Sequence, residues 1–364
     1  MKGLWHDLAP FATDTNGASS VFLELPALVI AQDSNGSAST LRRVVQRNKN
    51  WGSVQCLNLP EICYELGFTE DFLARMNEIC EATPRDFVVL VHGPVSALVG
   101  IDLEGLSRSL DEHTNIRSYA IETCGNEYYD AGLGLAYNLI CQEFVDWSRN
   151  AAWPGAVNVL GLNLLDFAGP ELREAVLGGL RAQGMDVLSV WGCQDGPAAW
   201  ANAAHASRNI VASASALPIA RRLEAEQGIP FTTIDTMGLV DHWAAGLSLE
   251  RGPRVLVVGE QVQSNLLRRL LVGMGASSVE VAGFFMMDSE LMEAGDKRLC
   301  GEADLRRLMG GSDYDLIIGD ETFARFAAAP YKPLLHAPAC FGRLEPCGLC
   351  PAWLESLARE WNAL

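Results

Sequence analysis

The feature that most constrains the fold is a repeating alternation of short apolar runs with segments that carry helix punctuation. The runs at 86–94 and 155–163 are nearly continuous apolar stretches, which is typical of strands buried on both faces of a parallel sheet. The segment after the second run has Pro170 near its start and Gly184 just past its end, as expected for a helix. The same alternation continues through the last third of the sequence, so we predict an α/β fold of doubly wound parallel sheets.

Two Gly- and Pro-containing breaks divide this alternation into three sets, near residues 151 and 252. We expect a first α/β domain over 1–150 with an irregular N-terminal segment, a second Rossmann-like domain over 151–251, and a third over 252–364 with a Cys-rich C-terminal tail. Ligands of such sheets bind at the carboxyl ends of the strands. The loops expected at those ends contain His92, Gly161, Cys193, Ser213, Glu260, Asp320 and His336.

Charge limits the classes of partner. The 364 residues carry a formal net charge of −18, which repels phosphate backbones and anionic lipid head groups. We therefore expect neither nucleic acid nor a membrane surface as a partner. Asp7 stands where a secretory signal would be apolar, and no early apolar run is long enough to span a bilayer. These observations predict a cytoplasmic protein.

Three common motifs of α/β enzymes are absent. No predicted strand is followed by G-x-G-x-x-G, so we expect no NAD site of the usual kind. No G-x-x-x-x-G-K-[ST] occurs, so the chain should bind no ATP directly. A hydrolase has no support either, because the chain lacks a G-x-S-x-G turn.

The stretch 93–136 carries a resemblance to a known family. Pro94 is followed by Gly100 and Asp102 at the start of a predicted helix, then by a strand and a loop that contains Gly125. This order resembles nitrogenase component 1 and its relatives, dark-operative protochlorophyllide reductase and the nickel-tetrapyrrole cyclase. The later domains match in the same order, at 158–163, 180–191, 209–231, 254–261, 313–326 and 334–338.

The resemblance implies three Rossmann-like domains around a central cleft and a pairing of homologous subunits, as a hetero- or homo-oligomer. In that family a separate ATP-dependent iron–sulfur reductase supplies electrons. They reach a cluster at the subunit interface, which Cys residues of the first domain hold. The missing P-loop fits this division of labour.

The chain departs from the family where that cluster would be bound. The three first-domain loops that should supply thiolates, 12–18, 34–39 and 91–96, contain no Cys. The residues at the expected ligand positions are Thr13 or Asp14, Ser37 and Gly93. We therefore expect that this chain does not hold the interface cluster in the usual way, and that a partner subunit holds or shares it.

A second departure lies in the second domain. Where the catalytic nitrogenase subunit binds the molybdenum cofactor through a Cys, the matching segment offers Ser213. A serine hydroxyl is far less acidic than a thiol and is a poor iron ligand. We expect Ser213 at a cofactor-facing position, but no molybdenum cofactor.

Several residues are candidates to replace the lost ligands or to act on a substrate. Asp14 is a hard oxygen donor near the expected interface, or else a turn residue before Asn-Gly. Cys56 and Cys63 are substitute cluster ligands or partly buried thiols. His92 and Cys124 each lie at the end of a predicted strand, where they contact substrate or serve only the structure.

The C-terminal tail contains the densest group of metal-binding side chains: His336, Cys340, Cys347 and Cys350. A C-x-x-C pair with Gly at its turn can clasp one metal ion. Ligand type alone admits zinc or an iron–sulfur cluster. The alternatives are a reducible thiol pair and unliganded loop thiols, and His336 could instead face the cleft as a catalytic residue.

Two functions of different class follow. The first is a subunit of a nitrogenase-like two-component reductase, which takes electrons from the ATP-dependent reductase and reduces a substrate bound between its domains. The second is a non-catalytic scaffold or carrier in metallocofactor assembly, which has kept the fold and lost the interface cluster.

Overall fold

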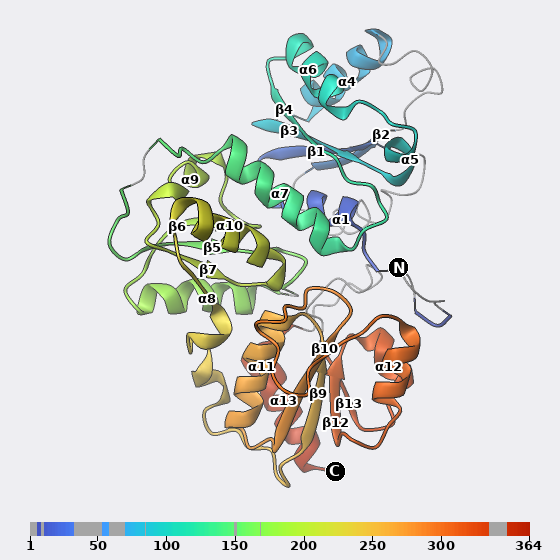
Figure 1. Cartoon of the computed structure of the whole chain (residues 1–364), viewed down its shortest axis with the longest axis vertical. Helices are drawn as coiled ribbons and strands as arrows, with labels where there is room; N and C mark the ends of the chain where they lie inside the picture. The colour runs from blue at the N-terminus through green and yellow to red at the C-terminus, as the bar shows by residue number, and fades with distance from the viewer. Residues whose placement is uncertain are drawn as a thin grey trace. The chain divides into compact units, whose positions relative to one another are not determined.

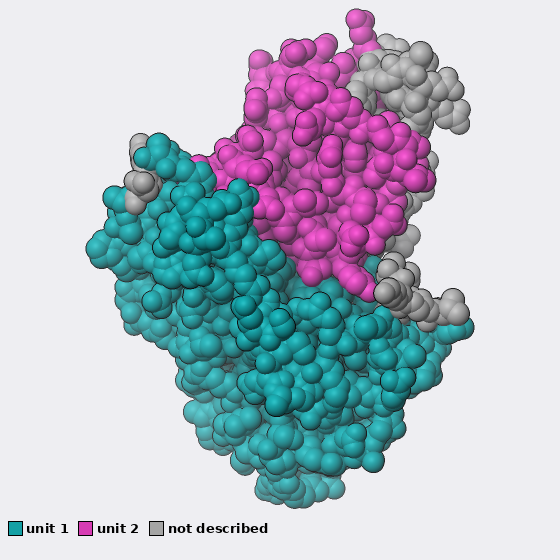
Figure 2. All heavy atoms as spheres, viewed as in Figure 1, with its two compact units in different colours: residues 1–11, 146–190, 202–364 teal, residues 12–145, 191–201 magenta. Residues whose placement is uncertain are grey.

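The structure is a computed structural model, and it shows the predicted α/β architecture with three separate sheets (Figure 1). Two compact units make up the chain: one contains residues 1–11, 146–190 and 202–364, the other 12–145 and 191–201 (Figure 2). The residues that the structure describes are 6–8, 11–32, 53–57, 70–83, 85–148, 151–167, 169–334 and 348–364.

The first sheet belongs to the unit around residues 12–145 and has the order β2-β1-β3-β4. Its strands are β1 (Ala27–Gln32), β2 (Ser53–Leu57), β3 (Phe87–His92) and β4 (Arg117–Ile121), and they pair in parallel. Every residue of β1 and β3 is buried, as their continuous apolar sequence predicts.

Helices cover both faces of this sheet (Figure 1). On one face lie α4 (Glu70–Ala82) and α6 (Leu103–His113), and their apolar side chains join those of β1 and β3 in one core cluster. On the other lie α1 (Asp14–Ser20) and α7 (Tyr129–Glu143). The short α5 (Pro94–Leu98) follows β3 directly.

The second sheet, in the other unit, has the order β6-β5-β7-β8. Its strands are β5 (Ala156–Leu160), β6 (Asp186–Trp191), β7 (Arg208–Val211) and β8 (Phe231–Thr233). Between them run α8 (Pro170–Ala182), α9 (Pro197–Trp200), the 3-10 turns η1 (Ala203–His205) and η2 (Ala214–Ala216), and α10 (Leu217–Gln227). Pro170 and Gly184 lie where the sequence placed the punctuation of α8.

The third sheet has the order β11-β10-β9-β12-β13 and lies in the same unit as the second. Its strands are β9 (Arg254–Val258), β10 (Ser278–Gly283), β11 (Lys297–Arg298), β12 (Leu316–Gly319) and β13 (Tyr331–Pro333). Figure 1 shows α11 (Gln261–Gly273) and α12 (Glu302–Met309) on either side of these strands. Three further 3-10 turns, η3 (Ile234–Thr236), η4 (Asp241–Ala244) and η5 (Glu321–Phe326), and the final helix α13 (Pro351–Asn362) complete the order.

One predicted element is shorter than expected. The sequence suggests a helix around 197–207, but α9 ends at Trp200 and only the separate turn η1 follows. Trp200 is fully buried with its ring against Phe144, whereas the His205 ring stacks on Trp153 and bonds to a backbone carbonyl. These two anchors interrupt the helix. Among the described residues, no helix combines the length and apolar character needed to span a bilayer.

Candidate functional site

The first sheet has a topological switch point, where ligands of open α/β sheets bind. In the order β2-β1-β3-β4, the strand that follows β1 lies on one side of it and the next lies on the other. A crevice therefore opens between the carboxyl ends of β1 and β3. The residues at those ends are Gln32 and His92, which are partners in the strand register.

Gln32 is a site residue that the sequence reasoning missed. Its backbone carbonyl accepts hydrogen bonds from Gly93 N and Ser96 Oγ, both at 2.7 Å, which fix the start of α5. Its side-chain amide is fully buried, and neither the oxygen nor the nitrogen has a hydrogen-bond partner among the described residues. A polar residue that ends an otherwise apolar strand was the available indication.

His92 lies at the predicted strand end and is buried. Its carbonyl accepts hydrogen bonds from Thr123 Oγ1 at 2.6 Å and from Thr15 Oγ1 at 2.9 Å. Burial lowers the pKa of His92, against weaker opposing effects of the Glu122 carboxylate and a backbone hydrogen bond of Ile101. The ring is therefore neutral at neutral pH, and its Nε2 has no hydrogen-bond partner within the described ranges.

Asp14 and Cys124, predicted from separate segments, lie side by side. Asp14 Oδ2 accepts a hydrogen bond from Cys124 N at 2.7 Å. Asp14 is 2% exposed, and its other oxygen, Oδ1, has no partner in the part of the chain that the structure describes. The Cys124 thiol is half-buried and free. Asp14 is the first residue of α1, so it is not the turn residue that the following Asn-Gly suggested.

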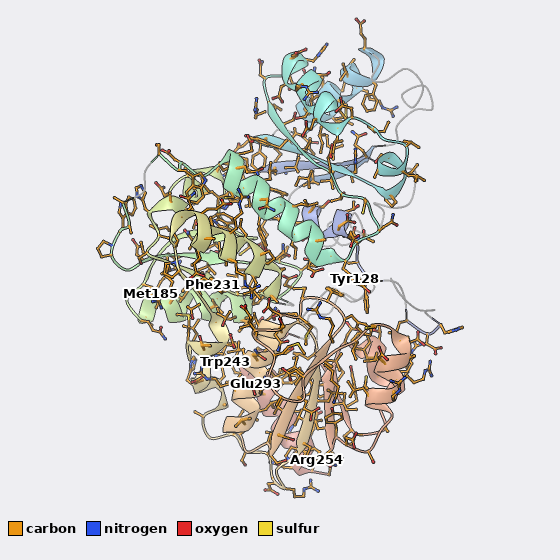
Figure 3. All side chains as sticks on the ribbon, in the orientation of Figure 1. Tyr128, Met185, Phe231, Trp243, Arg254 and Glu293 are labelled. Carbon is orange, nitrogen blue, oxygen red and sulfur yellow. The ribbon has the colours of Figure 1, made fainter. Side chains whose placement is uncertain are left out.

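Backbone contacts position Asp14. A Cβ atom on Gly132 of α7 would lie 1.8 Å from the Asp14 carbonyl oxygen, and one on Gly17 would lie 2.0 Å from the Tyr129 carbonyl oxygen. The two helices can therefore approach this closely only through glycines. Tyr128, labelled in Figure 3, precedes α7 and pairs with the residue before Asp14 in an antiparallel bridge.

The residues of the resemblance have defined structural roles at this edge. Gly125 has a positive φ of 69°, and a Cβ there would lie 2.5 Å from Pro94 Cγ, so the loop after β4 closes directly onto the start of α5. Asp102 caps α6 by accepting a hydrogen bond from Gly105 N at 2.7 Å.

This edge of the sheet carries the Asp14 carboxylate, the His92 imidazole at the end of β3 and the Cys124 thiol after β4, each a ligand type found at iron and other transition metals. In the ranges that the structure describes, no three His, Cys, Asp or Glu side chains form a group that could hold a metal ion. The described residues supply part of a ligand set, with one buried carboxylate oxygen still open to a bond.

The other predicted ligands are distributed differently. Cys56 lies on β2 opposite Ala31, one residue before the carboxyl end of the strand, and its side chain is not among those described. Cys350 is half-buried and precedes α13. The remaining predicted ligands fall outside the described residues: Ser37, Cys63, His336, Cys340 and Cys347.

Ser213 lies at the carboxyl end of the second sheet and is fully buried. Its Oγ is 3.1 Å from Asp166 Oδ2, to which it donates, and 3.0 Å from Ser215 Oγ. Its contact with a cofactor stays a prediction.

Three parallel sheets with helices packed against them place the protein among the α/β proteins. Comparisons with known proteins identify its family. The family model of nitrogenase component 1 type oxidoreductases matches residues 14–248, more than half of the chain. The protein belongs to this family, as its sequence indicated.

Solved structures show the same fold at low identity. Nitrogenase Cp1 at pH 6.5 superposes with a TM-score of 0.72 at 14% identity, covering 100% of this chain and 93% of its own. Nitrogenase Cp1 at pH 5 gives a TM-score of 0.71 at 13% identity, covering 99% and 89%. No curated protein sequence matches.

Proposed function

We propose that this chain is a redox subunit of a nitrogenase-like two-component reductase, in which Asp14 and Cys124 are its ligands to an iron–sulfur cluster shared with a homologous partner subunit. Electrons come from an ATP-dependent iron–sulfur reductase, because the chain has no P-loop of its own. The substrate binds between the domains of this subunit. The family membership supports this division of labour.

The observation that carries the proposal is the buried Asp14 carboxylate. A carboxylate excluded from water costs free energy unless both oxygens are bonded or coordinated. One oxygen takes the amide of Cys124, while the other has no partner among the described residues. A metal ion bound there would satisfy this oxygen, and it would lie near Cys124, whose amide bonds the same carboxylate.

The donor set fits a shared cluster. One thiolate and one carboxylate are too few for a four-iron cluster, so a second chain would supply the remaining ligands. Such a cluster, when bound, supplies one-electron transfer. On this chain, His92 contributes a neutral, buried Nε2 that can exchange a hydrogen bond or a proton with a bound substrate.

The experiment is iron and acid-labile sulfide analysis of the anaerobically purified complex of this chain with its homologous partner. Asp14→Asn keeps an acceptor for the Cys124 amide and removes the charge, and Cys124→Ala removes the thiol. We expect both variants to lose most of the iron and sulfide. Cys300→Ala, which removes an exposed thiol elsewhere, is the matched control and should retain both.

An iron-free wild-type complex would overturn the proposal and favour the scaffold in metallocofactor assembly. Iron that survives both Asp14→Asn and Cys124→Ala would place the cluster on the partner alone. The electron-transfer step is tested separately. The visible absorbance of the cluster is monitored while the ATP-dependent iron–sulfur protein reduces it.

We also propose that His336, Cys340, Cys347 and Cys350 bind a metal at the C-terminal tail. Cys350 directly precedes α13 and is half-buried, so it is available as a ligand. Metal analysis of the Cys347→Ala/Cys350→Ala double variant tests this site. Loss of zinc indicates a structural clasp, loss of iron with sulfide indicates a cluster, and unchanged metal content contradicts the proposal.

A further inference from the structure

The third sheet has a switch point of its own. In the order β11-β10-β9-β12-β13, β10 lies on one side of β9 and β12 lies on the other. The crevice between the carboxyl ends of β9 and β12 contains an apolar cavity of about 30 Å³. The side chains that make it apolar include Val258, Phe284, Phe285, Phe323 and Leu334.

One further side chain closes this cavity, and it comes from the other end of the chain. Phe11 lines the cavity, and its ring centroid lies 4.9 Å from that of Phe284 and 5.4 Å from that of Phe285. Phe284 in turn lies 6.1 Å from Phe323. Phe11 is 6% exposed, so its side chain is buried against the aromatic side chains that line the cavity.

A polar anchor holds the N-terminal segment beside Phe11. The backbone N–H groups of His6, Asp7 and Leu8 all donate to Glu302 Oε2, at 2.9, 2.9 and 3.2 Å. The other oxygen of Glu302 accepts from Arg306 at 2.8 Å. Three consecutive amides on one carboxylate oxygen form an anion-binding backbone nest, and here its anion is a residue of α12.

Two further bonds fix Asp7. Its carboxylate pairs with Arg306, and its carbonyl accepts a hydrogen bond from Arg325 Nη1 at 2.9 Å. The segment is thus held by hydrogen bonds and an ion pair at residues 6–8 and by tilted and edge-on ring contacts at residue 11. We call these four residues the latch; residues 9 and 10 lie outside the described ranges.

The polar groups at the crevice limit the charge of a ligand. Glu260 is fully buried, and its carboxylate accepts hydrogen bonds from the backbone of Ala214, Val262 and Gln263. Asp320 accepts two bonds from Thr322. The Asp320 carboxylate beside aromatic rings disfavours an anion and favours a flat neutral or cationic molecule.

We propose that the latch is a removable lid, and that its release opens a binding site for planar apolar molecules, neutral or cationic, at the carboxyl edge of the third sheet. This site needs neither a cluster nor a partner subunit. It therefore stands or falls separately from the proposed redox function.

The test is equilibrium binding of Nile red, a neutral planar dye, to the isolated iron-free chain, followed by fluorescence. Phe11→Ala removes the ring, and Glu302→Ala removes the anchor while keeping the ring. We expect each to increase the affinity at least tenfold over wild type. The double variant should bind no more than about twofold better than the better single variant, because both changes open the same site.

Location and charge preference need their own controls. Adding Phe284→Leu to Phe11→Ala should reverse the gain if the dye stacks in the crevice. An anionic dye, 1-anilinonaphthalene-8-sulfonate, should bind Phe11→Ala at least tenfold more weakly than Nile red does. Val272→Ala, which truncates an exposed apolar side chain of the same domain, should bind as wild type does.

Several outcomes would overturn the proposal. One is a wild-type chain that binds Nile red as tightly as both variants, and another is a gain that Phe284→Leu leaves intact. Circular dichroism will show whether Phe11→Ala folds. If it does not, the binding of Nile red to Glu302→Ala, which keeps Phe11, is the test. Binding by Glu302→Ala that equals that of wild type would refute the lid.

Discussion

The first and third sheets each have a crevice at the same topological position, but the first crevice is polar and the third is mostly apolar. In both, the earliest strand lies between the next strand in the sequence and a later one, so the ligand edge falls at equivalent places. The first crevice contains Gln32, His92 and Asp14, each with at least one buried polar atom that lacks a partner among the described residues. The third is lined by phenylalanines, and its two acidic residues are engaged by backbone amides. Topology places a site, and the residues after each strand decide what it binds.

The largest expected effect tests how the first crevice is built. Gly132→Ala would place a methyl group against the Asp14 carbonyl, and we expect it to destabilise the fold by about 3 kcal/mol or more. Gly134→Ala on the same helix is the control, because nothing lies within 4 Å of its Cβ position. It should be neutral or stabilise by up to about 1 kcal/mol. Urea denaturation measures both, and equal stability would contradict the close helix packing.

Replacing a buried polar side chain by an apolar one should have opposite effects on stability in the first and second sheets. Gln32→Met removes two buried groups without described partners, and we expect a stabilisation of about 1 kcal/mol. Asn158 on β5 is equally buried but bonds Ala203, Asn209 and Ser189. Asn158→Leu should therefore cost about 2 kcal/mol. Thermal unfolding distinguishes these cases, and a destabilising Gln32→Met would mean that the amide is bonded.

The two crevices should show pH dependences of opposite sign, because burial lowers the pKa of His92 in the first and raises the pKa of Glu260 in the third. Burial raises the pKa of Glu260 from its ordinary 4.5 to about 8, although backbone hydrogen bonds act in the other direction. The folded protein then binds the proton more tightly than the unfolded chain, so stability falls as pH rises from 4.5 to 8. The slope approaches about 1.4 kcal/mol per pH unit at most.

Glu260→Gln should flatten this slope between pH 5.5 and 8. A suitable control is Asp315→Asn: the Arg254 guanidinium, labelled in Figure 3, lowers the pKa of Asp315 to about 2. That carboxylate stays ionised over the whole range, so its loss should leave the slope unchanged. If the stability of Glu260→Gln still falls with pH over this range, the pH dependence arises from another titratable group.

The smallest effect concerns the latch at the third crevice. Hydrogen bonds from the backbone of Asp7 and His6, with Arg306, lower the pKa of Glu302 to about 2. The anchor is therefore fully present above pH 4.5 and is lost as pH falls toward 2. Hydrogen exchange of the residue 6–8 amides, corrected for intrinsic rates, should lose protection over that window. Constant protection would contradict an ionic anchor.

The sequence predicted the sheets well because buried parallel strands are short apolar runs with distinct ends. It also placed His92, Cys124 and Glu260 at or just past the carboxyl ends of strands. It could not pair Asp14 with Cys124, because the helix contact that joins them depends on two glycines with no motif of their own. Nor did it indicate that Phe11 lies against Phe284, since nothing local to an N-terminal segment specifies a partner about 270 residues away.

The contact between α1 and α7 makes residue 14 unusually easy to redesign. Backbone atoms meet at Gly17 and Gly132 in that contact, while the Asp14 side chain bonds the loop after β4 instead. The residue at position 14 can therefore change while the backbones of α1 and α7 keep their places. Asp14→Cys would place a second thiol near Cys124 without moving either helix. One substitution would then convert an oxygen ligand at this crevice into a sulfur ligand.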